Sequence, residues 1–285
     1  MADDLLSRSP VQYVDLGDAR IAYRCVGDGP PLVLLHGWPF DATTFGALVP
    51  RLADHFRCWL PDTPGLGVSE WTARTDFSLP GQAATIARFA DALHLGPCSI
   101  VAHDTGGTIA RLLAAREPQR VPKLVLLNTE MPGHRPPWIP LYRHLAALPG
   151  TAAGFATMMR LPAFLRSGMG FGGCFHDLSR IDAAFVARVV TPMVQSPARV
   201  AGTMRYLRGI DWAVIDGLTD THRRIDGEVL LVWGAEDPTF PITRAQQLPP
   251  QFRRCAGLIE ILNARFLVHE ERPAEVATAA LPFLL

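Results

Sequence analysis

The segment from Cys98 to Arg116, CSIVAHDTGGTIARLLAAR, constrains this 285-residue chain more than any other. A short apolar run, Ser99 to Ala102, leads into small residues, after which apolar residues recur at helical spacing. The pattern predicts a strand, a tight turn and a helix. Gly106 and Gly107 leave room for a strained turn that holds the side chain of Asp104 clear of the sheet.

An aspartate at such a turn favours displacement at carbon. With a pKa of about 4, its side chain is expected to be an anion at neutral pH and needs no base before it attacks. Attack on an acyl carbon would give an unstable anhydride, whereas attack on a saturated carbon with a leaving group gives an ordinary ester. The alternative is that Asp104 only caps the helix that opens at Thr105.

Strand and helix patterns alternate on both sides of this segment, which predicts an α/β protein with a mostly parallel, doubly wound sheet. A hairpin is expected from Gln12 to Val26, turning at Gly17 and Asp18. The further strands are expected at Pro31 to His36, Cys58 to Pro61, Lys123 to Leu127, Val229 to Trp233 and Leu258 to Leu262. Helices are expected near Thr44 to Ala53, Gln82 to Leu93 and Ala274 to Leu281.

The alternation stops after Asn128 for about a hundred residues, far longer than an ordinary connection. This segment is rich in proline and reads as short helices. We therefore predict a core made of residues 1–130 and 226–285, with residues 131–225 inserted as a helical cap.

Composition limits the partners. A net charge of zero gives no reason to expect nucleic acid or an anionic membrane. The five cysteines form no C-x-x-C pair, which indicates a reducing compartment. The first ten residues lack the pattern of a signal peptide, so a cytoplasmic protein is expected. No metal or organic cofactor is implied, because no cluster of ligand residues appears. The sequence gives no oligomeric state.

The order of motifs, with HGWP at His36 to Pro39, the turn at Asp104 and GAEDP at Gly234 to Pro238, resembles the α/β-hydrolase fold over essentially the whole chain. The aspartate resembles the nucleophile of haloalkane dehalogenases and epoxide hydrolases. This resemblance implies that the backbone N–H groups of Trp38 and Thr105 form an oxyanion hole. The indole N–H of Trp38 is a second candidate, as a donor to a departing anion.

The resemblance implies an acid that orients a histidine and a histidine that acts as general base. Two residues are candidates for the acid and one for the histidine. Asp237 stands where most α/β-hydrolases carry the acid that orients a histidine, and Glu130 stands where one branch of the haloalkane dehalogenases carries it; we favour Asp237. In NARFLVHEERP, Phe266 falls at the place of the family's histidine, and His269 follows three residues later. Either His269 swings over Asp104, or the general base is absent.

The candidates for the leaving group are mixed. Haloalkane dehalogenases of this pattern carry tryptophan directly after the nucleophile, where this chain has Thr105. Epoxide hydrolases use cap tyrosines, for which Tyr206 and Tyr142 are candidates, and Trp138 is a candidate for the pocket wall or an N–H donor. The cap is rich in Met, Leu and Phe, which predicts a small, neutral, apolar substrate.

These patterns lead to three functional hypotheses. Haloalkane dehalogenation through an ester on Asp104, completed by water, comes first, and epoxide hydrolysis second. The third is a catalytically altered member that binds a hydrophobic ligand or acts without hydrolysis, for which Phe266 is the reason.

Overall fold

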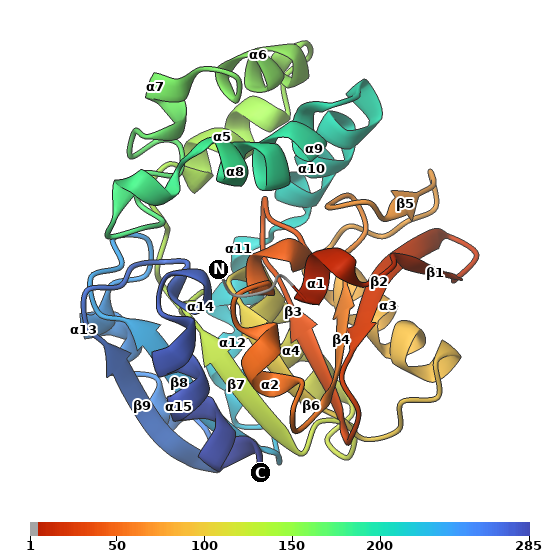
Figure 1. Ribbon diagram of the computed structural model, residues 1–285, viewed down its shortest axis with the longest axis vertical. Helices are drawn as coiled ribbons and strands as arrows, with labels where there is room; N and C mark the ends of the chain where they lie inside the picture. Colours follow the sequence, from red (N-terminus) through yellow and green to blue (C-terminus); the bar gives the residue numbers. More distant parts are fainter. Residues whose placement is uncertain (1–4) are drawn as a thin grey trace.

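The structure, a computed structural model, describes residues 5–285 (Figure 1). Within this range nine strands form one sheet in the order β1-β2-β4-β3-β6-β7-β8-β9, with β5 paired to β2. The strands are β1 (Gln12–Asp15), β2 (Ala19–Val26), β3 (Pro31–Leu35), β4 (Arg57–Pro61), β5 (Glu70–Trp71), β6 (Ser99–His103), β7 (Lys123–Leu127), β8 (Glu228–Gly234) and β9 (Cys255–Ile261). β2 runs antiparallel to its neighbours, and the pairs from β4 across to β9 are parallel. The predicted hairpin and mostly parallel sheet are confirmed.

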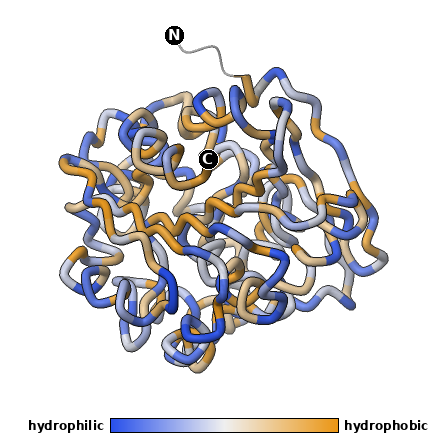
Figure 2. The backbone as a smooth tube through the Cα atoms, turned by 90° about the horizontal axis from the view of Figure 1, so that it is seen from below, coloured by the Kyte–Doolittle hydropathy of each residue, from blue (hydrophilic) through white to orange (hydrophobic). Residues whose placement is uncertain are grey.

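The central strands are buried on both faces, as continuous apolar runs in parallel sheets are. In β3, Leu32 and Leu34 pack in the cluster beneath α2 (Val49–Leu52) and α15 (Pro273–Leu284). Val33 and Leu35 face the cluster that holds α3 (Leu79–Ala92) and α4 (Thr105–Arg116). In Figure 2 the strands through the middle are orange and the blue segments lie mainly in outer turns. The sheet is therefore the middle layer of three.

The helix expected near Thr44 to Ala53 is two short pieces, the 3₁₀ helix η1 (Ala42–Phe45) and α2. Pro50 lies in the first turn of α2, a position that starts a helix but does not continue one. The expectation for residues 1–10 falls partly on residues 1–4, which lie outside the described range. None of the helices within 5–285 is long and apolar enough to cross a membrane.

Short helices fill the long connection between β7 and β8. They are α5 (Ile139–Ala146), α6 (Thr151–Met158), α7 (Pro162–Leu165), η2 (Leu178–Arg180), α8 (Ala183–Phe185), the π-helical η3 (Val186–Val190), α9 (Thr191–Val194), α10 (Pro197–Gly209), α11 (Trp212–Asp216) and α12 (Leu218–His222). Figure 1 shows α5 to α10 grouped beyond one end of the sheet. α12 returns to the core and packs against α4. The division into core and cap stays a prediction.

Three further short helices follow, α13 (Ile242–Ala245) after β8, η4 (Pro249–Gln251) before β9, and α14 (Val268–Glu271) before α15. The turns after β6, β7 and β8 all lie at the carboxyl ends of parallel strands. Ligand sites of open α/β sheets lie outside these ends. The residues that follow the three strands are therefore the ones to consider first.

Candidate active site

Asp104 lies between β6 and α4. Its backbone angles are φ +53° and ψ −133°, a conformation that residues other than glycine rarely adopt. Close packing around the turn requires glycine. A Cβ on Gly106 would lie 2.4 Å from the carbonyl oxygen of Leu35, and one on Gly37 would lie 2.1 Å from Oδ2 of Asp104. The strand, turn and helix predicted for this segment are confirmed, and the turn holds the carboxyl group against the loop after β3.

Backbone donors face the carboxylate from two sides. The N–H groups of Thr105 and Trp38 both lower the pKa of Asp104. The N–H of Trp38 also donates to Oγ1 of Thr105 at 3.0 Å, and this hydroxyl lies 3.5 Å from Oδ2 of Asp104. The two residues expected to form an oxyanion hole are thus brought together around Asp104.

The net effect on Asp104 is nevertheless to favour the protonated acid. Burial is the main cause that raises its pKa well above the usual range, and the negative charge of Glu130 is the next. The N–H donors oppose this shift without cancelling it. The expectation from sequence that Asp104 is ionised at neutral pH takes no account of this burial, and it stays a prediction.

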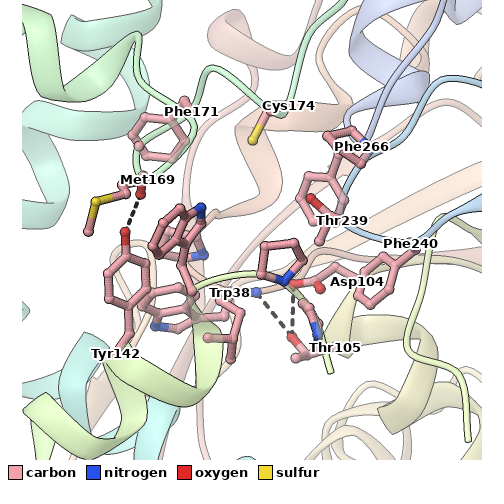
Figure 3. Close-up of a pocket in the computed structure, with 18 of the residues that line it drawn as sticks. Trp38, Asp104, Thr105, Tyr142, Met169, Phe171, Cys174, Thr239, Phe240 and Phe266 are labelled. Atoms are coloured by element: carbon pink, nitrogen blue, oxygen red, sulfur yellow. Dashed lines mark hydrogen bonds between the residues drawn. The ribbon is translucent and has the colours of Figure 1, made fainter. Parts of the chain in front are cut away.

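A cavity of about 220 Å³ opens directly above Asp104 (Figure 3). Its floor comes from the core and includes Trp38, Thr105 and Phe240, while segment 136–174 supplies Tyr142, Met169 and Phe171. The exposed lining is mostly apolar, and Asp104 and Glu130 are the acidic residues in it. Such a cavity suits a small, neutral, mainly apolar molecule.

Phe266 takes the place at this cavity where the family resemblance expects a histidine. The ring is 4% exposed and lies 5.8 Å from the ring of Phe240 and 6.0 Å from that of Phe40, centroid to centroid. In Figure 3 Phe266 stands beside the cavity on the same side as Phe240 and Asp104. A phenyl ring accepts no proton, so it supplies no general base.

His269 does not lie at the cavity, and the expectation that it swings over Asp104 is not what the structure shows. Its ring is fully buried, stacks on Phe45 at 4.5 Å and lies 4.6 Å from the ring of His103. Neither ring nitrogen has a hydrogen-bond partner in the described part of the chain. The physical reason is local: α14 begins at Val268, and its first turn directs His269 toward η1 behind the turn at Asp104.

Asp237 lies at the loop after β8, as expected, but no histidine adjoins its carboxylate oxygens. Oδ2 accepts a hydrogen bond from Nδ2 of Asn128 at 2.7 Å, and Oδ1 accepts one from the N–H of Thr239 at 2.7 Å. Burial raises the pKa of Asp237 to about 7, although these donors act against the shift. The role of Asp237 as an orienting acid therefore stays a prediction, and its oxygens bond to Asn128 and Thr239 instead of to a histidine.

Glu130 lines the cavity and is tied to a buried arginine. Its Oε2 accepts hydrogen bonds from the hydroxyls of Thr108 at 2.8 Å and Thr129 at 3.1 Å, and lies 4.0 Å from Nη2 of Arg111. Burial raises the pKa of Glu130, and the charge of Arg111 acts in the opposite direction. The carboxylate of Glu130 is therefore close enough to Asp104 for its negative charge to raise the pKa of Asp104.

Sequence reasoning missed Arg111, which is fully buried behind Asp104. Its guanidinium donates to the carbonyl oxygens of Gly107 and Glu130 and to the hydroxyl of Thr129, and it lies 3.1 Å from Nε2 of His222. The signal available in the sequence was an arginine on the helix directly after the turn, a position that also suits an exposed residue.

Two of the four candidates for the leaving group are occupied elsewhere. The indole Nε1–H of Trp38 donates to the carbonyl of Thr203 at 3.0 Å, which corrects the expectation that it faces a departing anion. The hydroxyl of Tyr206 lies 2.9 Å from Oγ1 of Thr105, and Tyr206 is not among the cavity lining, which corrects its expected role. Burial raises the pKa of Tyr206.

Tyr142 and Trp138 do line the cavity. The hydroxyl of Tyr142 donates to the carbonyl of Met169, and burial raises its pKa to about 12. Trp138 is 44% exposed at the cavity rim.

Cys174, to which the sequence pattern assigned no role at the site, also lies in the cavity wall. Burial raises the pKa of its thiol. Among residues 5–285 no group of three or more His, Cys, Asp and Glu is arranged to hold a metal ion.

Comparison with known proteins agrees with this architecture. The family model described as alpha/beta hydrolase fold matches residues 30–163. The magnesium-chelatase 30 kDa subunit of Rhodobacter capsulatus is 33% identical over 222 residues, which cover 75% of this chain and 73% of that protein. The chain belongs to the α/β-hydrolase fold family. The α/β-hydrolase fold expected from the order of motifs is confirmed.

Other members of the α/β-hydrolase family extend the similarity over nearly the whole chain. Haloalkane dehalogenase 2 of Mycobacterium tuberculosis is 27% identical over 275 residues, covering 94% of this chain and 92% of that one. The structure of the epoxide hydrolase CorEH superposes with a TM-score of 0.80 at 20% identity, covering 96% and 98% of the two chains. At that identity the structural match shows the fold alone. Dehalogenases and an epoxide hydrolase are thus among the proteins that this α/β-hydrolase resembles.

Proposed function

We propose that this α/β-hydrolase-fold protein binds a small, neutral, apolar molecule above Asp104 and does not complete a hydrolytic cycle. One observation carries the proposal. Phe266 lines the cavity at the place where a histidine was expected, and His269 is buried behind the turn at Asp104. Hydrolysis of an aspartyl ester requires a base that activates water, which is commonly worth a hundred- to ten-thousand-fold in rate. The cavity lining contains no histidine.

The remaining carboxyl groups are poor substitutes for that base. Both oxygens of Asp237 already accept hydrogen bonds, from Asn128 and Thr239. Glu130 is held by Thr108 and Thr129 through one oxygen, beside the buried guanidinium of Arg111. These hydrogen bonds hold the carboxyl groups of Asp237 and Glu130 in place, which supports a role in setting the electrostatic potential around Asp104.

The state of Asp104 indicates what the ligand carries. Burial and the charge of Glu130 raise the pKa of Asp104 well above its usual range, which favours the protonated acid, a hydrogen-bond donor. Asp104 lines the cavity among mostly apolar residues. An anionic ligand is disfavoured by Glu130 and by the apolar walls. These features together favour a neutral ligand with an acceptor atom for Asp104.

A second candidate is displacement of a leaving group by Asp104 in the manner of a haloalkane dehalogenase. The positive φ of Asp104 and the two N–H groups beside it favour this reading. An oxygen of Asp104, in its ionised form, would bond to the substrate carbon while the bond from carbon to bromine breaks and bromide leaves. Without a base the ester would remain. Epoxide opening is less favoured, because only Tyr142 of the two candidate tyrosines lines the cavity.

The test uses intact protein incubated with 1-bromohexane and with 1,2-epoxyhexane, followed by intact mass and by assays for bromide and diol. We expect no multiple turnover, and the Asp104→Asn variant provides the control for any adduct. In parallel, calorimetric titration should detect binding of 2-hexanone and much weaker binding of hexanoate. Repeated turnover without a lasting mass gain would overturn the proposal, and so would preference for the anion. A single stable adduct on Asp104 would support the second candidate.

A further inference from the structure

A second apolar cavity, also of about 220 Å³, adjoins the first between the helices α5, α6 and α10. Its lining includes Leu145, Phe155, Met158, Met204 and Leu207 and carries no charged side chain. α6 contributes to the lining although none of its side chains is fully buried. The space therefore lies beneath a helix whose side chains all remain at least partly exposed.

Two aromatic residues, Trp38 and Tyr142, belong to the linings of both cavities and form the wall between them. Their ring centroids are 6.4 Å apart. Trp38 is fixed to the carbonyl of Thr203 in α10 through its indole N–H. Tyr142 is held by one hydrogen bond from its hydroxyl to the carbonyl of Met169, which Figure 3 shows at the edge of the first cavity. Of the two wall residues, Tyr142 is therefore the one anchored outside the helices that line the second cavity.

We propose that the second cavity is a subsite for the aliphatic tail of the ligand whose polar head binds at Asp104, and that Tyr142 is the gate between them. This inference rests on the proposed function of the first cavity. A cavity of about 150 Å³ with apolar walls accommodates benzene, so the second cavity has room for several carbons. A flexible chain suits a subsite that is reached past Tyr142, and the uncharged lining disfavours a charged tail. Met158 and Met204 adapt readily to chains of different shape.

Gly154 offers a way to close the subsite without disturbing the core. It lies within α6, lines the second cavity, and a Cβ built on it meets no atom within 4 Å. The variant Gly154→Leu adds a bulky side chain to the helix face that also carries the lining residues Phe155 and Met158. The variant Gly154→Ala is the matched control, because it removes the same helix-interior glycine but fills little of the space.

The experiment measures Kd for the series of 2-alkanones from 2-butanone to 2-decanone by calorimetry, in the natural protein and in both variants. Each methylene that enters the second cavity is expected to lower Kd about fourfold. The gain with chain length should persist in Gly154→Ala and disappear in Gly154→Leu for the longer ketones. In Tyr142→Phe, which lacks the bond to Met169, the longer ketones should associate faster.

The outcomes separate the two proposals. If no ketone of any length binds, the proposed function of the first cavity fails and takes the subsite with it. If short ketones bind and Kd does not improve with length, only the subsite is overturned. A length dependence that survives in Gly154→Leu would likewise overturn it, because the tail would then lie elsewhere.

Discussion

The carbonyl oxygen of Phe266 accepts a hydrogen bond of 2.9 Å from Nε2 of His103, the residue directly before Asp104. The ring of His103 also lies 4.4 Å from the ring of Phe266. This contact ties the loop after β9 to the turn after β6, and it holds the Phe266 position at the cavity. The backbone is thus arranged to present a side chain to Asp104, but the side chain presented has no proton acceptor.

Replacement of Phe266 by histidine should therefore supply the missing base. In Phe266→His we expect hydrolysis of an ester on Asp104 to accelerate by about a hundred- to ten-thousand-fold, the usual value of general-base assistance. The measurement is the decay of the alkylated protein mass after treatment with 1-bromohexane, together with bromide release.

The double variant Phe266→His with Asp237→Asn is the control, since Asp237 is the acid that the family resemblance predicts to orient a histidine there. It should lose most of the gain. An adduct that persists unchanged in Phe266→His would contradict this account of the site.

Local sequence pattern predicted the strands and the turn at Asp104, but it did not predict the position of His269. The apolar run PLVLL of β3 and the glycines beside Asp104 specify their local structure, because burial on both faces and a positive φ leave few alternatives. The direction of His269 depends on where α14 begins after a loop, which local pattern does not determine. The indole N–H of Trp38 is likewise satisfied by Thr203, a residue 165 positions away.

Replacement of His269 by leucine should stabilise the protein, because the buried ring leaves both nitrogens without a partner in the described structure. We expect the free energy of unfolding to rise by about 1 kcal/mol, measured by urea denaturation at pH 7. His222→Leu is the matched comparison, since His222 contacts Arg111 and Gln251, and it should be destabilising. A loss of stability in His269→Leu would show that the ring has a partner or a packing role beyond these contacts.

The same histidine should make folding sensitive to acid. Burial lowers the pKa of His269 well below its ordinary value of 6.5, so the unfolded chain binds a proton that the folded chain does not. The free energy of unfolding of the natural protein therefore falls as pH drops below about 6.5. For one such group the loss is up to about 1.4 kcal/mol per pH unit. Urea denaturation of the natural protein and of His269→Leu between pH 5 and pH 8 measures this difference directly.

The natural protein should lose stability relative to His269→Leu as pH falls through this range. His222, whose pKa is lowered to about 3 and which lies away from His269, titrates the same way in both proteins and cancels in the comparison. Parallel curves for the two proteins would mean that His269 takes up its proton equally well when folded.

The hydroxyl of Tyr206 should contribute to stability and leave ligand binding unaffected. It lies 2.9 Å from Oγ1 of Thr105 but outside the cavity. Tyr206→Phe is expected to lower the free energy of unfolding by about 1 kcal/mol, the usual net value of a buried hydrogen bond. The Kd for 2-hexanone should stay within about twofold, which corresponds to less than 0.5 kcal/mol. A large rise in Kd would restore Tyr206 as a residue that acts on the ligand.

Neutralising Glu130 should make Asp104 a stronger acid. The negative charge of Glu130 is the largest charge effect that raises the pKa of Asp104, so Glu130→Gln removes it while the amide oxygen can still accept from Thr108. We expect the titration of the Asp104 side-chain carboxyl, followed by carbon-13 NMR, to move to lower pH. In Asp237→Asn the same shift should be smaller, because the charge of Asp237 affects Asp104 less. If the titration stays in place in Glu130→Gln, burial alone raises the pKa of Asp104, and the charge of Glu130 has no part in it.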